Sequence, residues 1–150
     1  MPIDERERAR RRRLAKAHID AENAHDLDAI MASFASDAMN VVNNDVSTTS
    51  EGIRQVHALF GLGPEPGILS DLRVVPEHEH FTDEEIVHEG RFRGVHTGSA
   101  PGFPPPSGQS IELPYIVVYR FDDNDKLVSE RATIDMSPLT RALFPIGSTP

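Results

Sequence analysis

The chain has 150 residues, of which 38% are apolar and 26% charged, and it contains no cysteine. This composition fits one globular domain and excludes a disulfide framework, a thiolate metal site and a cysteine nucleophile. The net charge of −9 argues against general nucleic-acid binding, which needs a basic surface. No apolar run approaches the roughly 20 residues that span a bilayer. The first residues lack the apolar core of a secretory signal, so we expect a cytoplasmic protein without a membrane partner.

A short basic block near the N-terminus opposes the overall negative charge. It comprises Arg6, Arg8 and residues 10–13, with acidic residues interleaved. Such a block can bind an anionic partner or form the solvated first turns of a helix. An apolar stripe starts directly after the block at Leu14, which favours the solvated helix start.

Apolar residues at helical spacing predict three helices in the first 61 residues. The first spans about residues 5–24, on a stripe of Leu14, Ala17, Ala21 and Ala24. The second follows Asp26, a typical N-cap, with Leu27, Ile30, Met31 and Phe34 on one face. The third starts at a Ser50 cap and stops at Gly61, with Ile53, Val56, His57 and Phe60 on one face. A histidine such as His57 on an apolar face is more often a satisfied core residue than a ligand. Residues 40–43 are typical of a short strand and residues 44–50 of a loop.

From residue 71 the apolar period changes to two, which predicts strands. Residues 72–80 form one strand, with Leu72, Val74, His78 and His80 on one face. Residues 84–98 form another, with Ile86, His88, Phe92 and His96 on one face and Glu89, Arg91 and Arg93 on the other. After a proline-rich loop, residues 109–121 and 126–135 form a hairpin around an acidic turn. Residues 137–144 are typical of a short terminal helix.

Helices come first and strands follow, which is the pattern of an α+β fold. We expect one domain over residues 1–150, with residues 1–13 as a basic lead and residues 145–150 as a tail. A curved antiparallel sheet is expected to pack on the N-terminal helices and to leave a cone-shaped hollow, with the hairpin as one wall.

Glu130 is the strongest candidate for a catalytic group. Alternation places it with Val128, Ala132 and Ile134 on one face of the last strand. Burial among apolar groups raises the pKa of a carboxyl group, as a general acid or base near neutral pH requires. The structural alternative is an ion pair with an arginine of a neighbouring strand: Arg91, Arg93 or Arg120.

Other polar side chains can face the same hollow. Tyr115 and Tyr119 can offer phenol groups to a substrate oxygen or serve as core residues, and His88 and His96 lie on the facing strand. His78 and His80 could share a metal ion, but spacing fixes no third ligand, so we expect no metal site. The sequence has no motif of a serine-hydrolase elbow, a P-loop, a dinucleotide fold or a zinc-protease helix.

Four stretches carry a family resemblance. AENAHDLDAIMASFASDA is similar to a pattern "agDldal…lfadDv", and EGIRQVHALF to a "G-r-e-a-i" helix. RFRGVHTG with PPPSGQSIEL is similar to "GtHtG…ippTGk", and YIVVYRFDDNDKLVSERATIDMSPLTRAL to "fr-F-dGkiv-e…D…ll-qL". In this order and spacing they resemble the SnoaL-like (polyketide cyclase-like) family of the nuclear transport factor 2-like superfamily, over roughly residues 15–145.

The resemblance implies an α+β cone of the nuclear transport factor 2-like or cystatin-like type, with a pocket between a curved sheet and helices. It also implies homodimers paired through the sheet, and polyketide cyclases that close rings by acid–base catalysis without a cofactor. Ketosteroid isomerase and limonene-epoxide hydrolase belong to the same superfamily, and many members have no known activity.

The sequence departs from the cyclase pattern at the reaction centre. Glu130 stands where the cyclases have a histidine, Ala132 where they have the acid–base aspartate, and Val117 where they keep a polar residue. At matching positions we expect catalytic roles for Glu130, His96, Tyr115 and Asp135. Substrate contacts are expected from Tyr119, His88, Phe92, Val117, Ala132, Ile134 and Arg91. Alternation puts Asp135 on the face opposite Glu130, which favours a cap of the terminal helix through the amides of Ser137 and Leu139.

Three functions stay open at this point. The first is a cofactor-free cyclase or isomerase acting on a small apolar ketone or polyketide-like compound, with Glu130 as acid–base and His96 or Tyr115 polarising an oxygen. The second is a non-catalytic ligand-binding or dimerisation module, which Ala132 at the acid position supports. The third is an epoxide-hydrolase-like reaction, for which Arg91 and Asp135 are the only parts and a second aspartate is missing at a matching site.

Overall fold

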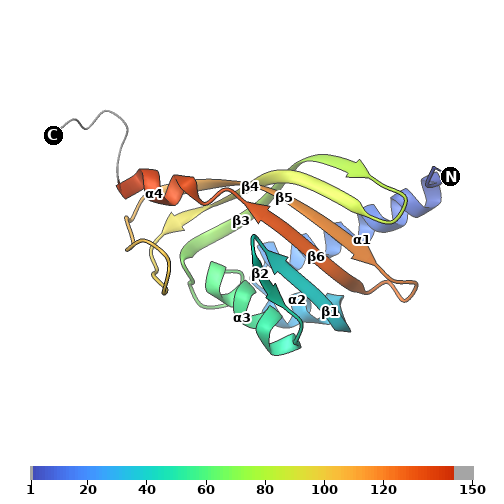
Figure 1. The fold of residues 1–150 in the computed structure, drawn as a ribbon, viewed down its shortest axis with the longest axis horizontal. Helices are drawn as coiled ribbons and strands as arrows, with labels where there is room; N and C mark the ends of the chain where they lie inside the picture. Colours follow the sequence, from blue (N-terminus) through green and yellow to red (C-terminus); the bar gives the residue numbers. More distant parts are fainter. Residues whose placement is uncertain (1, 144–150) are drawn as a thin grey trace.

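Four helices and six strands make up the part of the chain that the structure describes, residues 2–143 of a computed structural model (Figure 1). The helices are α1 (Glu5–Asn23), α2 (Leu27–Ser33), α3 (Ser50–Phe60) and α4 (Ser137–Leu143). The strands are β1 (Phe34–Val42), β2 (Asp45–Ser47), β3 (Leu69–Phe81), β4 (Ile86–His96), β5 (Ser110–Phe121) and β6 (Leu127–Ile134). They form one sheet in the order β2-β1-β6-β5-β4-β3. The predicted α+β fold, with N-terminal helices on a curved open sheet, is confirmed.

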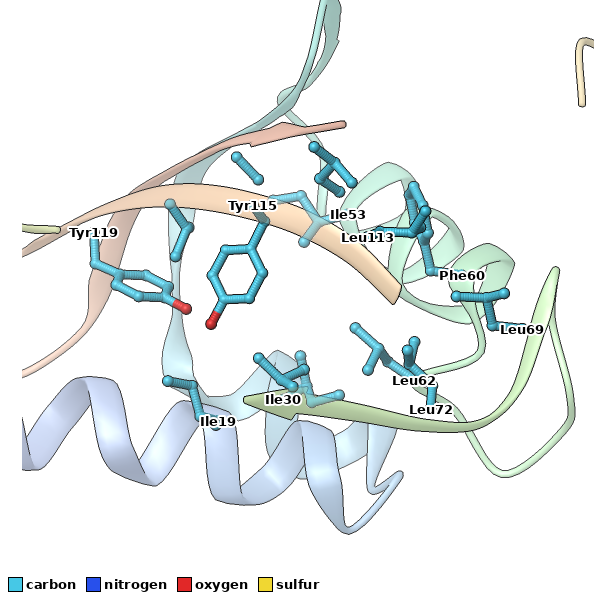
Figure 2. Close-up of a cluster of buried hydrophobic side chains, with 14 of the residues drawn as sticks. Ile19, Ile30, Ile53, Phe60, Leu62, Leu69, Leu72, Leu113, Tyr115 and Tyr119 are labelled. Atoms are coloured by element: carbon cyan, nitrogen blue, oxygen red, sulfur yellow. The ribbon is translucent and has the colours of Figure 1, made fainter. Parts of the chain in front are cut away.

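The core fills the space between the sheet and the first three helices. Figure 2 shows β5 bending over it, with Leu113, Tyr115 and Tyr119 directed inward. Ile19 of α1 and Ile53 of α3 approach this cluster from the helical side. The interior of the cone is therefore lined by strand and helix side chains together.

Hydrogen bonds join α1 to the sheet and its turns near both ends of the helix. Near the N-terminal end the buried guanidinium of Arg11 donates to three carbonyls of the β3–β4 turn, at 2.9 to 3.2 Å. Nε of Arg10 lies 2.7 Å from Oδ1 of Asp125 in the β5–β6 turn. At the other end the side chain of Asn23 accepts from the amide of Val74 at 2.8 Å and donates to its carbonyl at 3.0 Å. These contacts fix α1 relative to β3.

The buried stripe of α1 differs from the predicted one. Leu14 is half-buried and Ala17 is exposed, whereas the buried positions are Arg11, Ala15, His18, Ile19 and Glu22. Polar side chains with partners inside the fold share this stripe, and a pattern of apolar residues does not detect them. The basic block is therefore part of α1, and Arg11 is buried rather than solvated.

Pairing between distant strands changes the region after α2. The predicted second helix is one residue too long, because Phe34 begins β1 and pairs with Leu127 of β6. β1 runs parallel to β6, so the sheet is mixed rather than antiparallel throughout. Residues 45–47 pair with β1 as β2, where the sequence predicts a loop. The cap of α3 is Thr49, whose side chain accepts from the amide of Gly52 at 3.1 Å, and not Ser50.

A register shift in β3 turns two histidines away from the interior. The shift lies between Pro76 and His78, and beyond it His80 pairs with Val87. His78 and His80 are therefore exposed, and they do not share a face with Val74 as predicted. The predicted pair of strand histidines does not face the hollow.

A second shift lies at the start of β6. Arg120 pairs with Ser129 and Phe121 with Leu127, which leaves Val128 as an extra residue in β6. Leu127 is consequently fully buried and Val128 only half-buried, the reverse of the prediction. Beyond this bulge the prediction is correct, because Glu130, Ala132 and Ile134 are all buried.

α4 begins at Ser137 as predicted. The predicted end of this helix at Phe144 and the predicted tail over residues 145–150 lie outside the described residues. Within residues 2–143, none of the helices has the length and apolar character that crossing a membrane requires.

Candidate functional site

Four buried ionisable side chains meet inside the cone, and we call them the His–Glu quartet: His18, Glu22, His57 and Glu130. His18 and Glu22 lie one turn apart on α1, His57 on α3 and Glu130 on β6. Their side chains are only 0 to 8% exposed. Buried charges normally need partners that compensate for lost water, and in this quartet each carboxylate faces both histidines.

The contacts within the quartet are close but longer than hydrogen bonds. Nε2 of His18 lies 3.4 Å from Oε1 of Glu22 and 3.7 Å from Oε2 of Glu130. Nε2 of His57 lies 3.8 Å from Oε1 of Glu22 and 3.6 Å from Oε2 of Glu130. Charge-assisted N–H···O bonds are about 2.7–2.9 Å long. The four atoms therefore surround a common point rather than forming bonded pairs.

The other ring nitrogen of each histidine fixes the orientation of the ring. Nδ1 of His57 lies 2.8 Å from the carbonyl oxygen of Ile53, so it carries a proton and donates it. Nδ1 of His18 lies 2.8 Å from Oγ of Ser33, which itself donates to the carbonyl of Ile30 at 2.6 Å. Ser33 thus accepts from His18. In both rings Nδ1 holds a hydrogen, and Nε2 is the atom that faces the carboxylates.

Uncharged side chains enclose the quartet. Nδ2 of Asn40 donates to Oε2 of Glu130 at 3.2 Å. The rings of Phe34 and Tyr119 contact His18 edge-on, with centroids 5.4 and 5.8 Å apart. Phe34 also lies against His57, at 5.7 Å. The quartet is therefore a polar centre inside a largely apolar and aromatic shell.

Charges within the quartet shift the pKa values of His18, His57 and Glu130. Burial lowers the pKa of His18, but the carboxylates of Glu22 and Glu130 outweigh it and raise the pKa to about 10. The pKa of His57 is also raised, because Glu130 and Glu22 outweigh its burial. Burial would raise the pKa of Glu130, but the two histidines hold it well below its usual range. At neutral pH a carboxylate and an imidazolium therefore coexist.

Glu130 is buried as predicted, but its pKa shifts in the opposite direction. The prediction of a raised pKa is wrong because it took the surroundings of Glu130 to be apolar, and α1 and α3 each supply a histidine. The predicted alternative of an arginine partner is not found either. Arg91 and Arg93 pair with Glu112, and Arg120 pairs with Glu84.

His96 and Tyr115 lie elsewhere on the sheet. Glu130 pairs with Tyr119, which pairs with Ile86, and His96 stands ten residues further along β4, or about 30 Å along the strand. His96 is fully buried beside the proline-rich loop. It does not reach an oxygen held at Glu130. Tyr115 is nearer, and Figure 2 shows its hydroxyl and that of Tyr119 directed to the same part of the interior.

Most of the predicted substrate contacts line the interior. Tyr119, His88, Val117, Ala132 and Ile134 are buried on the inner face. Phe92 is half-buried and packs on Tyr115, with centroids 4.7 Å apart. Of these, Tyr119 contacts the quartet directly through His18, and the ring of His88 lies edge-on to Tyr119 at 5.6 Å.

Arg91 and Asp135 lie apart from the quartet, on the outer face of the sheet. Both are exposed, and both border a hollow of about 430 Å³ on that face. Arg91 pairs with Glu77 and Glu112 at 2.8 Å. Asp135 accepts from the amide of Ser137 at 2.9 Å, and this contact lowers its pKa. The predicted helix cap is thus present at Ser137, whereas the amide of residue 139 bonds to a backbone carbonyl instead.

A groove lies between α1 and β3, beside Ile19, the neighbour of His18 on α1. It has a volume of about 410 Å³ and is bordered by Ile19, Val74, Pro76 and His88 together with charged residues such as Arg12, Lys16 and Glu79. Burial lowers the pKa of His88, against the effect of the neighbouring Glu79. A second hollow of about 380 Å³ lies between α3, the proline-rich loop and α4.

Sequence reasoning missed three residues of the site: His18, Glu22 and Asn40. All three are polar residues in segments whose structure was predicted from the spacing of apolar residues. A signal was present, since a histidine and a glutamate at i, i+4 on one helix lie on the same face. Their burial depends on α3 and β6, which lie far away in the chain.

The sequence matches the model of the SnoaL-like domain family over residues 15–130. A search of curated proteins found no significant match.

Solved structures of similar proteins agree with the fold. One is a proposed SnoaL-like polyketide cyclase from Jannaschia sp. CCS1, with 20% identity, a TM-score of 0.75 and coverage of 95% of this chain and 94% of the other. Another is AclR, a proposed hydroxylase from Streptomyces galilaeus, with 20% identity, a TM-score of 0.74 and coverage of 95% and 85%. A protein of ketosteroid isomerase-like fold from Catenulispora acidiphila, in complex with trimethylamine, has 16% identity, a TM-score of 0.68 and coverage of 91% and 97%.

Proposed function

Because this chain belongs to the SnoaL-like domain family, we propose that it is a small-molecule enzyme of the cyclase or isomerase type. Its reaction centre is the His–Glu quartet, and its substrate is a small apolar ketone or polyketide-like compound. The observation that carries the proposal is the pairing of Glu130 with two histidines inside the cone. A carboxylate and an imidazolium side by side are the base and the acid that proton transfer next to a carbonyl requires.

The proposed reaction begins with loss of a proton from the carbon beside the substrate carbonyl. Glu130 takes the proton, and the electrons of the broken C–H bond form an enolate. The hydroxyl of Tyr119 donates a hydrogen bond to the enolate oxygen. This phenol stays protonated, because burial and the charges of Glu22 and Glu130 raise its pKa well above the usual value.

Two outcomes of the enolate are consistent with the quartet. In an unsaturated ketone the enolate extends over the C=C bond, and its far carbon takes a proton from the imidazolium of His57; the proton on Glu130 then passes to His57, and the product is an isomer. Attack of the enolate carbon on a second carbonyl of the same molecule forms a C–C bond and closes a ring, with the new alkoxide taking the proton from His57. Neither route needs a redox partner, so both balance with the substrate alone.

The groove between α1 and β3 is the proposed binding place for the substrate. Ile19 and Val74 supply apolar contact there, and His88 supplies a polar group. His88 touches Tyr119, which touches His18. We propose that the Tyr119 and His88 rings move to admit a ligand from the groove to the quartet. The trimethylamine complex of the similar protein from Catenulispora acidiphila supports binding of small molecules by this fold.

Exchange of protons with deuterated water tests the proposal without knowledge of the product. A panel of apolar ketones and 1,3-diketones is incubated with the protein in D₂O, and exchange beside the carbonyl is followed by proton NMR. We expect exchange of at least one compound, and a loss of about a hundredfold or more in Glu130→Gln. Glu112→Gln, on the outer face, is the matched control and keeps full exchange. Equal rates in both variants would rule out the role of Glu130.

A binding module without catalysis is the second candidate. The side chains of the quartet are at most 8% exposed, and Ala132 stands at the position of the cyclase acid. Both observations favour a protein that holds a ligand and does not transform it. Ketones that raise the melting temperature of the protein, yet exchange no faster than in buffer, would select this candidate.

A homodimer through the sheet is part of the proposal. On the outer face Ile116 is 46% exposed among charged pairs such as Arg91–Glu112 and Arg131–Glu85. A second copy would cover this apolar residue, while the charged pairs suit the polar rim of an interface. Light scattering coupled to gel filtration should give twice the chain mass of 16.6 kDa, and Ile116→Glu should give the monomer.

A further inference from the structure

We propose that the His–Glu quartet is a four-coordinate binding site for a divalent transition metal ion, with Zn²⁺ as the ion that suits its ligands best. The ligand atoms are Nε2 of His18, Nε2 of His57 and one carboxylate oxygen each from Glu22 and Glu130. This inference goes beyond the acid–base function and stands independently of it, because metal binding is measured without any substrate.

The nitrogen–oxygen separations in the quartet are close to those around a tetrahedral ion. Zn²⁺ binds histidine nitrogen and carboxylate oxygen at about 2.0–2.2 Å, and a tetrahedron with such bonds separates its corners by about 3.4 Å. The four nitrogen–oxygen separations here are 3.4, 3.6, 3.7 and 3.8 Å. All ligand atoms lie within 4.8 Å of one another. Contraction by up to a few tenths of an ångström gives these four nitrogen–oxygen edges the length that they have around a tetrahedral ion.

The direction of the lone pairs points to a cation between the side chains. Nδ1 of His18 donates its hydrogen to Oγ of Ser33, and Nδ1 of His57 donates its hydrogen to the carbonyl of Ile53. When a ring gives up its second proton, Nε2 presents a lone pair to the carboxylates, which are themselves acceptors. Nε2 of His18 is completely buried and has no hydrogen-bond partner among the described residues. An ion at the centre would satisfy this nitrogen and both carboxylates at once.

The surroundings have the features that support metal ligands in proteins. A metal-binding histidine usually donates its other N–H to a carbonyl, a carboxylate or water, and His57 donates to the carbonyl of Ile53. A ligating carboxylate is usually hydrogen-bonded as well, and Asn40 donates to Glu130. The two carboxylates balance the charge of one divalent ion, so an occupied site is neutral inside its apolar shell.

Protons and a metal ion exclude each other in this cluster. When Nε2 of His18 and Nε2 of His57 each carry a proton, the quartet holds imidazolium groups beside carboxylates, as the acid–base proposal requires. With an ion bound, the same nitrogen and oxygen atoms are occupied and Glu130 cannot take a proton from a substrate. A bound Zn²⁺ is therefore expected to suppress the exchange reaction, and a chelator to restore it.

The test uses the full-length, untagged chain after removal of metal with a chelator and exhaustive dialysis. Zn²⁺ is titrated by calorimetry, and Co²⁺ by visible absorption, which is intense for four-coordinate and weak for six-coordinate ions. We expect one ion per chain and the intense Co²⁺ spectrum. A wild-type chain that binds no ion in a saturable way, or that gives only the weak spectrum, would overturn the proposal.

Variants then assign the ligands. Glu22→Gln and His57→Gln should each weaken Zn²⁺ binding by about tenfold or more. His96→Gln is the matched control, because His96 is a buried histidine far from the quartet, and it should bind as the wild type does. Circular dichroism checks that each variant is folded. Folded variants of Glu22 and His57 with unchanged affinity would contradict the assignment, even if the wild type binds an ion.

Discussion

Nε2 of His57 on α3 lies 3.6 Å from Oε2 of Glu130 on β6, inside a cone where neither side chain is more than 8% exposed. This contact joins the helical layer to the sheet through charge rather than through apolar packing. Removing one partner takes away half of the other's compensating contacts within the quartet, and a buried charge that loses such a contact is destabilising.

Glu130→Gln should therefore destabilise the protein by about 3–5 kcal/mol, the usual cost of breaking a buried ion pair. The neutral amide does not compensate the charge of the imidazolium rings. The pKa values of His18 and His57 are no longer raised by the carboxylate of Glu130. Urea unfolding followed by circular dichroism measures the difference. Glu112→Gln, whose carboxylate is on the exposed outer face, should unfold almost like the wild type. If the two variants have the same midpoint, the buried pair contributes nothing.

The stability of the metal-free protein should fall as the pH rises from 6.5 towards 10. His18 has a folded pKa of about 10 against an ordinary value of 6.5. The folded state holds this proton more tightly than the unfolded state, so the stabilisation is complete below pH 6.5 and is lost as the pH passes through about 10. Melting temperatures in chelator-treated buffer measure this slope. His18→Gln should show a flatter profile over the same range, and an unchanged slope would exclude His18 as its source.

His88 should give the opposite pH dependence, with stability lost as the pH falls. Burial lowers its pKa from 6.5, although Glu79 works against that shift. The unfolded chain then takes up the proton more readily, so stability falls as the pH drops through 6.5 and below. His88→Gln should remove part of this acid sensitivity, which melting curves between pH 5 and 7 would reveal. A variant with greater acid sensitivity than the wild type would mean that Glu79 dominates.

Gly61 should tolerate no side chain. It ends α3 with a φ of +107°, and a Cβ there would lie 2.1 Å from the carbonyl oxygen of Leu69. Gly61→Ala should therefore cost more than about 1 kcal/mol in the free energy of unfolding. Gly102 is a matched control, since its φ is +84° but a Cβ there would meet no atom within 4 Å. Chemical unfolding of both variants separates steric overlap from backbone strain, and equal losses would mean that strain alone acts.

The sequence was sufficient to predict those elements whose period is set by their own residues. The period-two pattern of β4 and β5 placed His88, Tyr115 and Tyr119 on the inner face, where they are found. The helical stripe of α3 placed His57 toward the interior. These predictions hold because burial of one face fixes the pattern of a strand or helix independently of its partner.

The failures arise where two distant segments decide the outcome together. Phe34 follows the helical stripe of α2, yet it joins a strand because β6 offers a parallel partner. The quartet depends in the same way on α1, α3 and β6. A buried Glu22 looks like a solvated residue until the histidine of another helix is known to face it. Periodicity records which side of a segment is apolar, not which charges meet across the core.

The contacts that hold α1 against the sheet also determine the position of two quartet residues. Arg11 ties the helix to the β3–β4 turn, and Asn23 ties it to Val74. His18 and Glu22 lie between Arg11 and Asn23 on α1. The distance of their ligand atoms from β6 therefore depends on these two contacts at the edge of the molecule. Changes in the turn at residues 82–85 can thus alter the quartet while the core stays intact. A chain that begins after Arg11, for instance at Leu14, would keep every residue of the quartet and lose its alignment.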